Sequence, residues 1–436
     1  MSKKDLFGVE SCEGKKSATD RSGAVRVQRA ERNQVELRPS CLEDLLPEDH
    51  RARLLWSAVS RLDLSAFYEE VGSRDGSAGR PAIDPKILIV LWLYATSEGV
   101  GSARELERLS TSHDAYRWIC GGVSVNHHTL SDFRVGHGEA LDALMTKILG
   151  VLMHAGMLKL RRVAQDGVRV RAAAGAASFR RERSLRKCLK AAREQVQATK
   201  RLMSSEGGAA TAREKSARLQ AAKEREARLT KALAQLDQVR ESKGAKEEKA
   251  EARVSTTDPE ARVMKMPDGG FRPAYNVQLA TDTKSRVIVG VSVSNKGSDL
   301  GQMNPMLRQI KSRTGALPKE QLVDGGYVKL DDIETAAQQN VAVFAPPQKP
   351  RTAKTPARRR VDGPGVAAWR CRMQTERGAE IYKQRAATAE RVNADLRTWR
   401  GLGPVLVRGA DKVLCLALWS AITYNLLRCF SLGVLG

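Results

Sequence analysis

Three carboxylates stand where they could carry chemistry in this chain. Asp166 lies within a predicted strand, Asp324 ends a later apolar run, and Glu390 lies in a helical segment further along. An all-oxygen set of this kind suits a hard divalent cation, Mg²⁺ or Mn²⁺. Two such ions, about 3.5–4 Å apart, can activate an attacking oxygen and stabilise a leaving one during in-line displacement at phosphate. We therefore expect Asp166, Asp324 and Glu390 to bind two metal ions.

More polar side chains surround Glu390 on its predicted helix. At about 100° per residue, Tyr382, Asn393, Arg397 and Glu390 fall on one face of an α-helix, and Arg385 lies to the side of Tyr382. A face with an acid, an amide, a phenol and a guanidinium is too polar to pack in a core. It predicts an active-site wall on which Tyr382, Arg385 and Arg397 position phosphates.

Two other acids compete for the third position. Glu376 and Glu380 precede Glu390, but neither has a downstream arginine in the register that Arg397 has to Glu390. An isolated Asp-Gly pair is also typical of an ordinary turn. The hypothesis therefore depends on all three acids in their order, and not on any one of them.

The elements that must position the acids form an alternating pattern. Predicted strands cover residues 163–170, 275–279, 287–293, 321–324 and 341–344, and predicted helices run from about 298 to 310 and from 331 to 337. A meander of three strands followed by alternating helices and strands is typical of the α/β ribonuclease-H-like topology, in which the first and fourth strands are neighbours. The ends that carry Asp166 and Asp324 would then adjoin.

The rest of the chain divides by composition. Residues 1–40 lack a hydrophobic period and predict a flexible basic arm, and residues 41–158 predict an all-helical DNA-binding domain. Residues 181–254, rich in Ala, Glu, Lys, Arg and Leu, predict a helical-hairpin insertion. Residues 159–180 and 255–436 would form the catalytic domain around it.

The charge balance predicts an anionic partner. The chain has 436 residues, with 74 Lys and Arg against 50 Asp and Glu, a formal net charge of +24 and a sequence pI near 10.0. Nucleic acid is the leading candidate because cationic side chains release its condensed counterions. The expected DNA contacts flank the acidic motifs: Arg161, Arg162, Arg169, Arg180, Arg181, Lys349, Arg351, Arg358, Arg359 and Arg360.

Several other classes of protein are disfavoured. The apolar run 413–430 is interrupted by polar residues and predicts a buried helix instead of a membrane span. The chain has no G-x-x-x-x-G-K-[ST] loop for a nucleotide and no Cys pair with zinc-site spacing. The N-terminus lacks a secretory apolar core, so we expect a cytoplasmic, nucleoid-associated protein with no membrane partner.

At the acidic motifs the sequence resembles the bacterial insertion-sequence transposases of the DDE type. The strings that resemble this family are Asp166-Gly167, Val323-Asp324-Gly325-Gly326-Tyr327, Tyr382-x2-Arg385-x4-Glu390-x6-Arg397, GRPAIDP (79–85), STTDPEARVMKM (255–266) and FRPAYNVQLATD (271–282). Arg397 stands where the family signature often has Lys, which keeps the charge and changes the geometry at phosphate.

The resemblance implies an activity and a set of partners. It implies hydrolysis of a phosphodiester at the element ends and transfer of the freed 3′-OH into target DNA. The partners would be double-stranded DNA, both the terminal inverted repeats and the target, with the protein as a homodimer on DNA. Two alternatives stay open, a metal-dependent nuclease without strand transfer and a catalytically inactive DNA-binding derivative.

Overall fold

The computed structural model describes residues 41–74, 81–204, 212–243, 249–347 and 362–433. Two parts of the sequence interpretation lie outside these ranges. They are the expected basic arm 1–40 and the five expected DNA contacts Lys349, Arg351, Arg358, Arg359 and Arg360.

Residues 42–158 form short helices around an apolar core. They are η1 (Glu43–Leu45), α1 (Arg51–Ser60), α2 (Ser65–Glu69), α3 (Pro85–Ser97), α4 (Ala103–Ser112), α5 (Asp114–Cys120), α6 (His127–Gly136) and α7 (Gly138–His154). Local sequence explains where they begin. Asp84 accepts a 2.8 Å hydrogen bond from the backbone N–H of Lys86 and caps α3, whose first residue is Pro85. Helix α3 is buried along almost its whole length.

A six-stranded mixed sheet holds the acidic residues. Its strands are β1 (Arg162–Arg171), β4 (Arg262–Lys265), β5 (Phe271–Asp282), β6 (Ile288–Ser294), β7 (Glu320–Leu322) and β8 (Ala342–Phe344). The order is β4-β5-β1-β7-β8, with β6 also paired to β5. Strand β5 runs antiparallel to β1 and β6, whereas β7 and β8 run parallel to β1. This is the ribonuclease-H-like arrangement, with β1 and β7 as neighbours.

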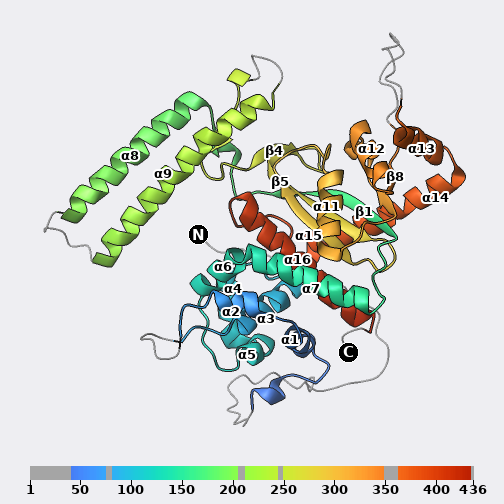
Figure 1. Cartoon of the computed structure of the whole chain (residues 1–436). Helices are drawn as coiled ribbons and strands as arrows, with labels where there is room; N and C mark the ends of the chain where they lie inside the picture. The colour runs from blue at the N-terminus through green and yellow to red at the C-terminus, as the bar shows by residue number, and fades with distance from the viewer. Residues whose placement is uncertain (1–40, 75–80, 205–211, 244–248, 348–361, 434–436) are drawn as a thin grey trace, which may run out of the picture. The chain divides into compact units, whose positions relative to one another are not determined.

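Helices and short elements complete this region. They are η2 (Ala176–Ser178), β2 (Phe179–Arg180), β3 (Val254–Ser255), α11 (Met303–Thr314), η3 (Gly325–Tyr327), α12 (Leu330–Gln338), α13 (Pro364–Met373), α14 (Glu376–Arg385), η4 (Ala386–Glu390), α15 (Arg391–Trp399) and α16 (Ala410–Ser431). Figure 1 shows α14 and α15 in orange and red beside the strands. Helix α11 begins at Met303 and not near Ser298, so Asp299 lies in a loop.

Two long helices lie between β2 and β3. Helix α8 (Glu182–Ser204) and helix α9 (Ala212–Glu241) pack side by side in opposite directions (Figure 1). They bury an apolar seam of Leu185, Leu189, Ala192, Leu229, Ala232 and Leu236. The ion pair between Glu182 and Arg240 joins the start of α8 to the end of α9.

Helix α16 belongs to the protein core. Among the described residues it is the one helix that is long and apolar enough to cross a membrane, but 72% of its most apolar window is buried inside the protein. It contacts α3, α6, α7 and β6. The Asn425 amide hydrogen-bonds both the N–H and the C=O of Ile288, at 2.9 and 2.8 Å. These two hydrogen bonds satisfy the Asn425 side chain inside the core.

Candidate active site

The pairing of β1 with β7 fixes where two of the acids lie. The parallel register places Ala164 opposite Leu322. Continued by two residues, the same register sets Asp166 level with Asp324, and the period of two in a strand puts both on the same face. Strand β7 ends after Leu322, and Asp324 caps the short helix η3 by accepting a 2.7 Å hydrogen bond from the N–H of Gly326.

Asp166 is the centre of the polar contacts. One carboxylate oxygen accepts a 3.0 Å hydrogen bond from the N–H of Gly167 and lies 3.6 Å from the Arg385 guanidinium. The other accepts a 3.0 Å hydrogen bond from the side-chain amide of Asn393. Strand β1 and the helical segment that carries Glu390 therefore meet at this carboxylate.

The surroundings of Asp166 disfavour its ionised form. Burial, partly offset by the Arg385 guanidinium and reinforced by the negative charges of Asp324 and Asp299, raises the pKa of Asp166 to about 6. Its side chain is 20% exposed. A carboxylate held near two like charges is stabilised by any cation that enters the space between them.

Glu390 lies further out than the other two acids. Its side chain is 62% exposed, and its carboxylate lies 3.5 Å from the Arg385 guanidinium. Arg385 is itself only 14% exposed and reaches Asp166 with its other terminal nitrogen. Within the described part of the chain, Glu390 is thus linked to Asp166 through this guanidinium and not directly.

The helix that carries Glu390 differs from the expected one. Residues 386–390 form a π-turn, η4, between α14 and α15, so the 100° spacing used for an unbroken α-helix is wrong across this segment. In an ideal helix Arg385 and Asn393 would be about 80° apart, whereas one extra residue brings them to within about 20°. This explains why both side chains reach Asp166.

Two other residues of the predicted active-site wall, Tyr382 and Arg397, lie in different places. Tyr382 is half-buried against the sheet, with its ring 6.0 Å from the Arg385 guanidinium. Arg397 is exposed and lines a cavity of about 450 Å³ together with Arg169, Arg171 and Arg272. The rival acids Glu376 and Glu380 are exposed on α14, and within the described ranges neither pairs with Arg385.

The expected DNA-contacting arginines near β1 fall into two groups. Arg161 and Arg180 are exposed, as is Arg181, which pairs with Glu251. Arg162 and Arg169 are already held by the protein. Arg162 pairs with Glu320 at 2.5 Å, and Arg169 donates a 2.8 Å hydrogen bond to the carbonyl of Gly297. These two side chains are less available to DNA than their sequence position indicates.

Asp299 lies near Asp166, and it was not identified from the sequence as a residue of the site. Its carboxylate accepts hydrogen bonds of 2.6 and 2.7 Å from the side chains of Asn276 and Gln278 on β5. It also lies 3.7 Å from the Arg169 guanidinium. The space beside Gly167 is filled by these polar groups, and a Cβ there would lie 2.6 Å from the Asp299 side chain, so a larger residue at 167 would have to displace them. Asn276 and Gln278 are two polar side chains on a strand that is buried along most of its length. Such a pair indicates that a polar partner, here Asp299, lies against the strand.

A chain of buried amides lies under the acids. Gln321 on β7 donates to Gln165 on β1 at 3.0 Å, and Gln165 donates to Gln278 on β5 at 3.0 Å. The Tyr327 hydroxyl donates to the same Gln278 oxygen. All four side chains are almost fully buried. The network joins the three strands and η3, and the Gln321 side-chain oxygen within it is buried without a hydrogen-bond partner.

The donor set fits a hard divalent cation only in part. Asp166 and Asp324 supply adjoining oxygens, and the Asn393 side-chain oxygen beside them is buried without a hydrogen-bond partner. Within the described ranges, no three His, Cys, Asp or Glu side chains lie close enough together to hold a metal as they stand. The oxygen chemistry therefore fits, whereas Glu390 lies outside the pair formed by Asp166 and Asp324.

Two family models match the chain. Residues 40–136 match the family model described as Transposase domain (DUF772), and residues 238–426 match the one described as Transposase DDE domain. No curated protein and no solved structure matches the chain. The second match contains Asp324 and Glu390, and the first covers most of the helical region. The two matches identify the chain as an insertion-sequence transposase of the DDE type.

Proposed function

We propose that this transposase hydrolyses a phosphodiester at each end of its element and then joins the freed 3′-OH to target DNA. The observation that supports the proposal best is the meeting of two elements at Asp166. The β1–β7 register sets Asp166 level with Asp324, and Arg385 and Asn393 contact Asp166 from the segment that bears Glu390. These contacts support a site in which Asp166, Asp324 and Glu390 act together.

Asp166, Asp324 and Glu390 are the residues that would hold the divalent metal ions that DDE transposases generally use. When bound at carboxylates, Mg²⁺ or Mn²⁺ ions, two in our proposal, activate the attacking oxygen and stabilise the leaving one. Asn393 orients Asp166 through its amide hydrogen bond, and Arg385 balances the charge of Asp166 and Glu390. We expect Arg385, Tyr382 and Arg397 to position phosphate groups once DNA is present.

The helical region 42–158 would recognise the inverted repeats, and the protein would act as a homodimer when assembled on DNA. As a DNA-acting transposase it works in the cytoplasm, and we propose association with the nucleoid. No nucleotide is required, because transesterification conserves the number of phosphodiester bonds.

A joining assay tests the proposal. Duplexes that carry the inverted repeats flanking the gene, one set intact and one set already cut to expose the 3′-OH, are incubated with full-length protein, Mg²⁺ and supercoiled target DNA. We expect both sets to yield covalently joined products. Cleavage of the intact set without joining of the cut set would identify a nuclease, and binding without either reaction would identify an inactive DNA-binding derivative.

A further inference from the structure

Helix α8 has a strongly asymmetric surface. Its apolar face, with Leu185, Leu189, Ala192 and Val196, is buried. At about 100° per residue, six cations fall within an arc of about 100° on one flank of this face, and the opposite flank carries no charged residue. The six are Arg183, Arg186, Lys190, Arg193, Lys200 and Arg201. Helix α8 has two acids, Glu182 and Glu194. Glu182 falls within the same arc and pairs with Arg186 and Arg240, and Glu194 lies at the back of the helix and also lines the groove described below.

Four cations of this basic flank, Arg183, Arg186, Lys190 and Arg193, are exposed to solvent. Arg186 pairs with Glu182 at 2.6 Å and Arg193 with Glu226 at 3.3 Å, and both arginine side chains are at least 60% exposed. Exposed ion pairs of this kind contribute little free energy, so they can be exchanged for a phosphate. Arg183 and Lys190 are exposed and have no ion-pair partner among the described residues.

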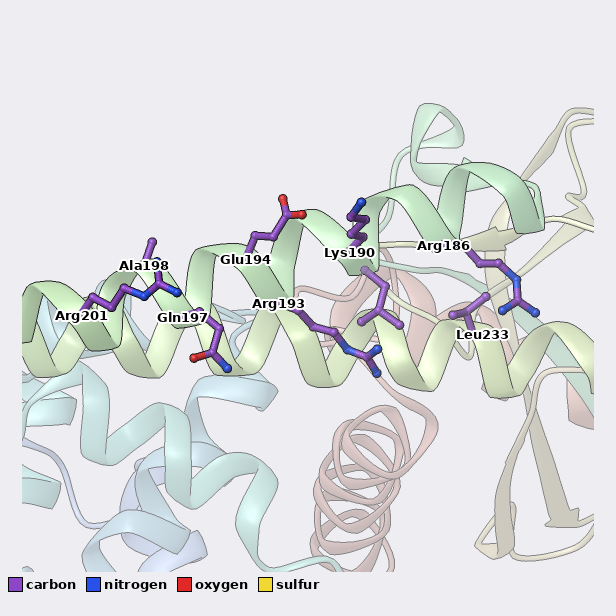
Figure 2. Close-up of a pocket in the computed structure, with 9 residues that line it drawn as sticks. Arg186, Lys190, Arg193, Glu194, Gln197, Ala198, Arg201 and Leu233 are labelled. Atoms are coloured by element: carbon purple, nitrogen blue, oxygen red, sulfur yellow. The ribbon is translucent and has the colours of Figure 1, made fainter.

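The flank borders a groove between the two helices. The groove has a volume of about 530 Å³, and Leu189 and Leu233 contribute its apolar lining. In Figure 2 the side chains of Arg186 and Arg193 lie over the space between α8 and α9, whereas Lys190 points away from α9. The cations therefore point in several directions along one edge, which suits an extended anion better than a single small one.

The length of the flank fits the backbone of duplex DNA. From residue 183 to residue 201 an α-helix rises about 27 Å, at 1.5 Å per residue. Phosphates of one strand follow each other about every 3.4 Å along the duplex axis. An anionic membrane surface is a poorer fit, because a membrane-surface helix needs an exposed apolar face and that of α8 is covered by α9.

We propose that the basic flank of α8 is a second DNA-binding surface, which binds the phosphate backbone of duplex DNA without reading its sequence. The proposal rests on the proposed function only in that DNA is the substrate. Lys and Arg neutralise phosphates at any sequence, so this surface adds affinity and holds DNA while the helical region selects the ends.

The test measures how the affinity of full-length protein for a random duplex depends on salt. One variant changes Arg183, Arg186 and Lys190 to Gln. A matched control removes the same charge from the same hairpin outside the flank, by changing Arg213, Arg218 and Lys223 of α9 to Gln. We expect the log–log salt slope of the α8 variant to fall by about 0.9 for each phosphate that is no longer neutralised, up to about 2.7 in all, and that of the control to change little. Equal slopes in the two variants would overturn the proposal.

A second measurement needs no variant. Acetylation of lysines in the wild-type protein, with and without random duplex DNA, reports which side chains DNA covers. Protection of Lys190 with Lys223 left reactive supports the proposal, and equal reactivity of Lys190 with and without DNA contradicts it. The joining assay separates the two proposals. Normal joining of cut ends by the α8 variant at low salt, with no change in its salt slope, would remove the second surface and leave the transposase function intact.

Discussion

The active site is built from two regions that are fixed in different ways. On the sheet side, Asp166 and Asp324 are set by strand register and by the buried amides beneath them. On the helical side, Glu390 is exposed, is the last residue of the π-turn and, among the described residues, is linked to Asp166 through Arg385. The site thus has a sheet half, with two half-buried acids, and a helical half, with an exposed acid and the Arg385 cation.

The difference has an electrostatic cause. The sheet side brings like charges together in a half-buried position, and burial is the largest contribution to the raised pKa of Asp166. The helical side supplies the compensating cation, Arg385, and the exposed acid. Ionised Asp166 therefore carries a free-energy cost on the sheet side, which a bound cation would reduce. In the free protein, the Arg385 guanidinium from the helical side already reduces part of this cost.

The largest expected effect comes from removing the charge of each acid. Asp166→Asn, Asp324→Asn and Glu390→Gln keep the shape of the side chain but remove the charge that a hard cation requires. We expect cleavage of end duplexes to fall by about a thousandfold or more, since loss of several kcal/mol costs tenfold for each 1.36 kcal/mol. Gel-based cleavage rates measure this, with DNA binding as a folding control.

The matched controls are Glu376→Gln and Glu380→Gln, which should cleave almost normally. If Glu390→Gln cleaves at the wild-type rate while one of these controls is inactive, the helical half of the site has been assigned to the wrong residue.

The second prediction concerns the stability of the folded protein and tests only the sheet side of the site. The folded protein keeps the Asp166 proton up to about pH 6, while the ordinary pKa is 3.8, so stability is lost as the pH rises between these values. Asp166→Asn does not carry this cost. We expect it to be more stable than the wild type by up to about 3 kcal/mol at pH 8, and equally stable near pH 3.

Urea unfolding at both pH values in the presence of a chelator measures the difference. The corresponding change on the helical side, Glu390→Gln, should leave stability nearly unchanged because that carboxylate is exposed. A Glu390→Gln variant stabilised as much as Asp166→Asn would remove the contrast between the two halves.

A smaller effect is expected where the two halves touch. Asn393→Ala removes the 3.0 Å hydrogen bond to Asp166 and leaves the charges in place. A hydrogen bond to a charged group contributes about 1.5–3 kcal/mol, so cleavage should fall by roughly ten- to a hundredfold. Thr398→Ala, an exposed change on the same helix, is the control. Wild-type cleavage by Asn393→Ala would show that the π-turn does not serve the site through this residue.

The smallest effect is expected at Asp299. Asp299→Asn keeps an acceptor for Asn276 and Gln278 but removes one of the charges that raise the pKa of Asp166. The acid limb of the pH profile for cleavage should move to lower pH by less than one unit. A shift to higher pH would show that Asp299 acts on Asp166 in another way.

The sequence predicted the sheet side of this site better than the helical side. The predicted strands 163–170 and 321–324 were enough to indicate that the elements carrying Asp166 and Asp324 are neighbours, and the structure pairs β1 with β7 in parallel. The π-turn could not be predicted from the sequence, because residues 386–390 contain neither Gly nor Pro. The wider turn there depends on tertiary contacts. Asp299 was hidden because it follows no strand, and its partners Asn276 and Gln278 read as the polar face of an ordinary alternating strand.

The buried position of α16 has a consequence for cooperativity. One apolar cluster contains Leu91 and Leu144 of the helical region, Val168 and Val289 of the sheet, and Ile422 of α16. A fragment that starts at residue 159 would leave the apolar side of α16 in water, at a cost of about 25 cal/mol for each Å² exposed. The helical region and the sheet should therefore melt in a single transition, and recognition and chemistry share one folding unit.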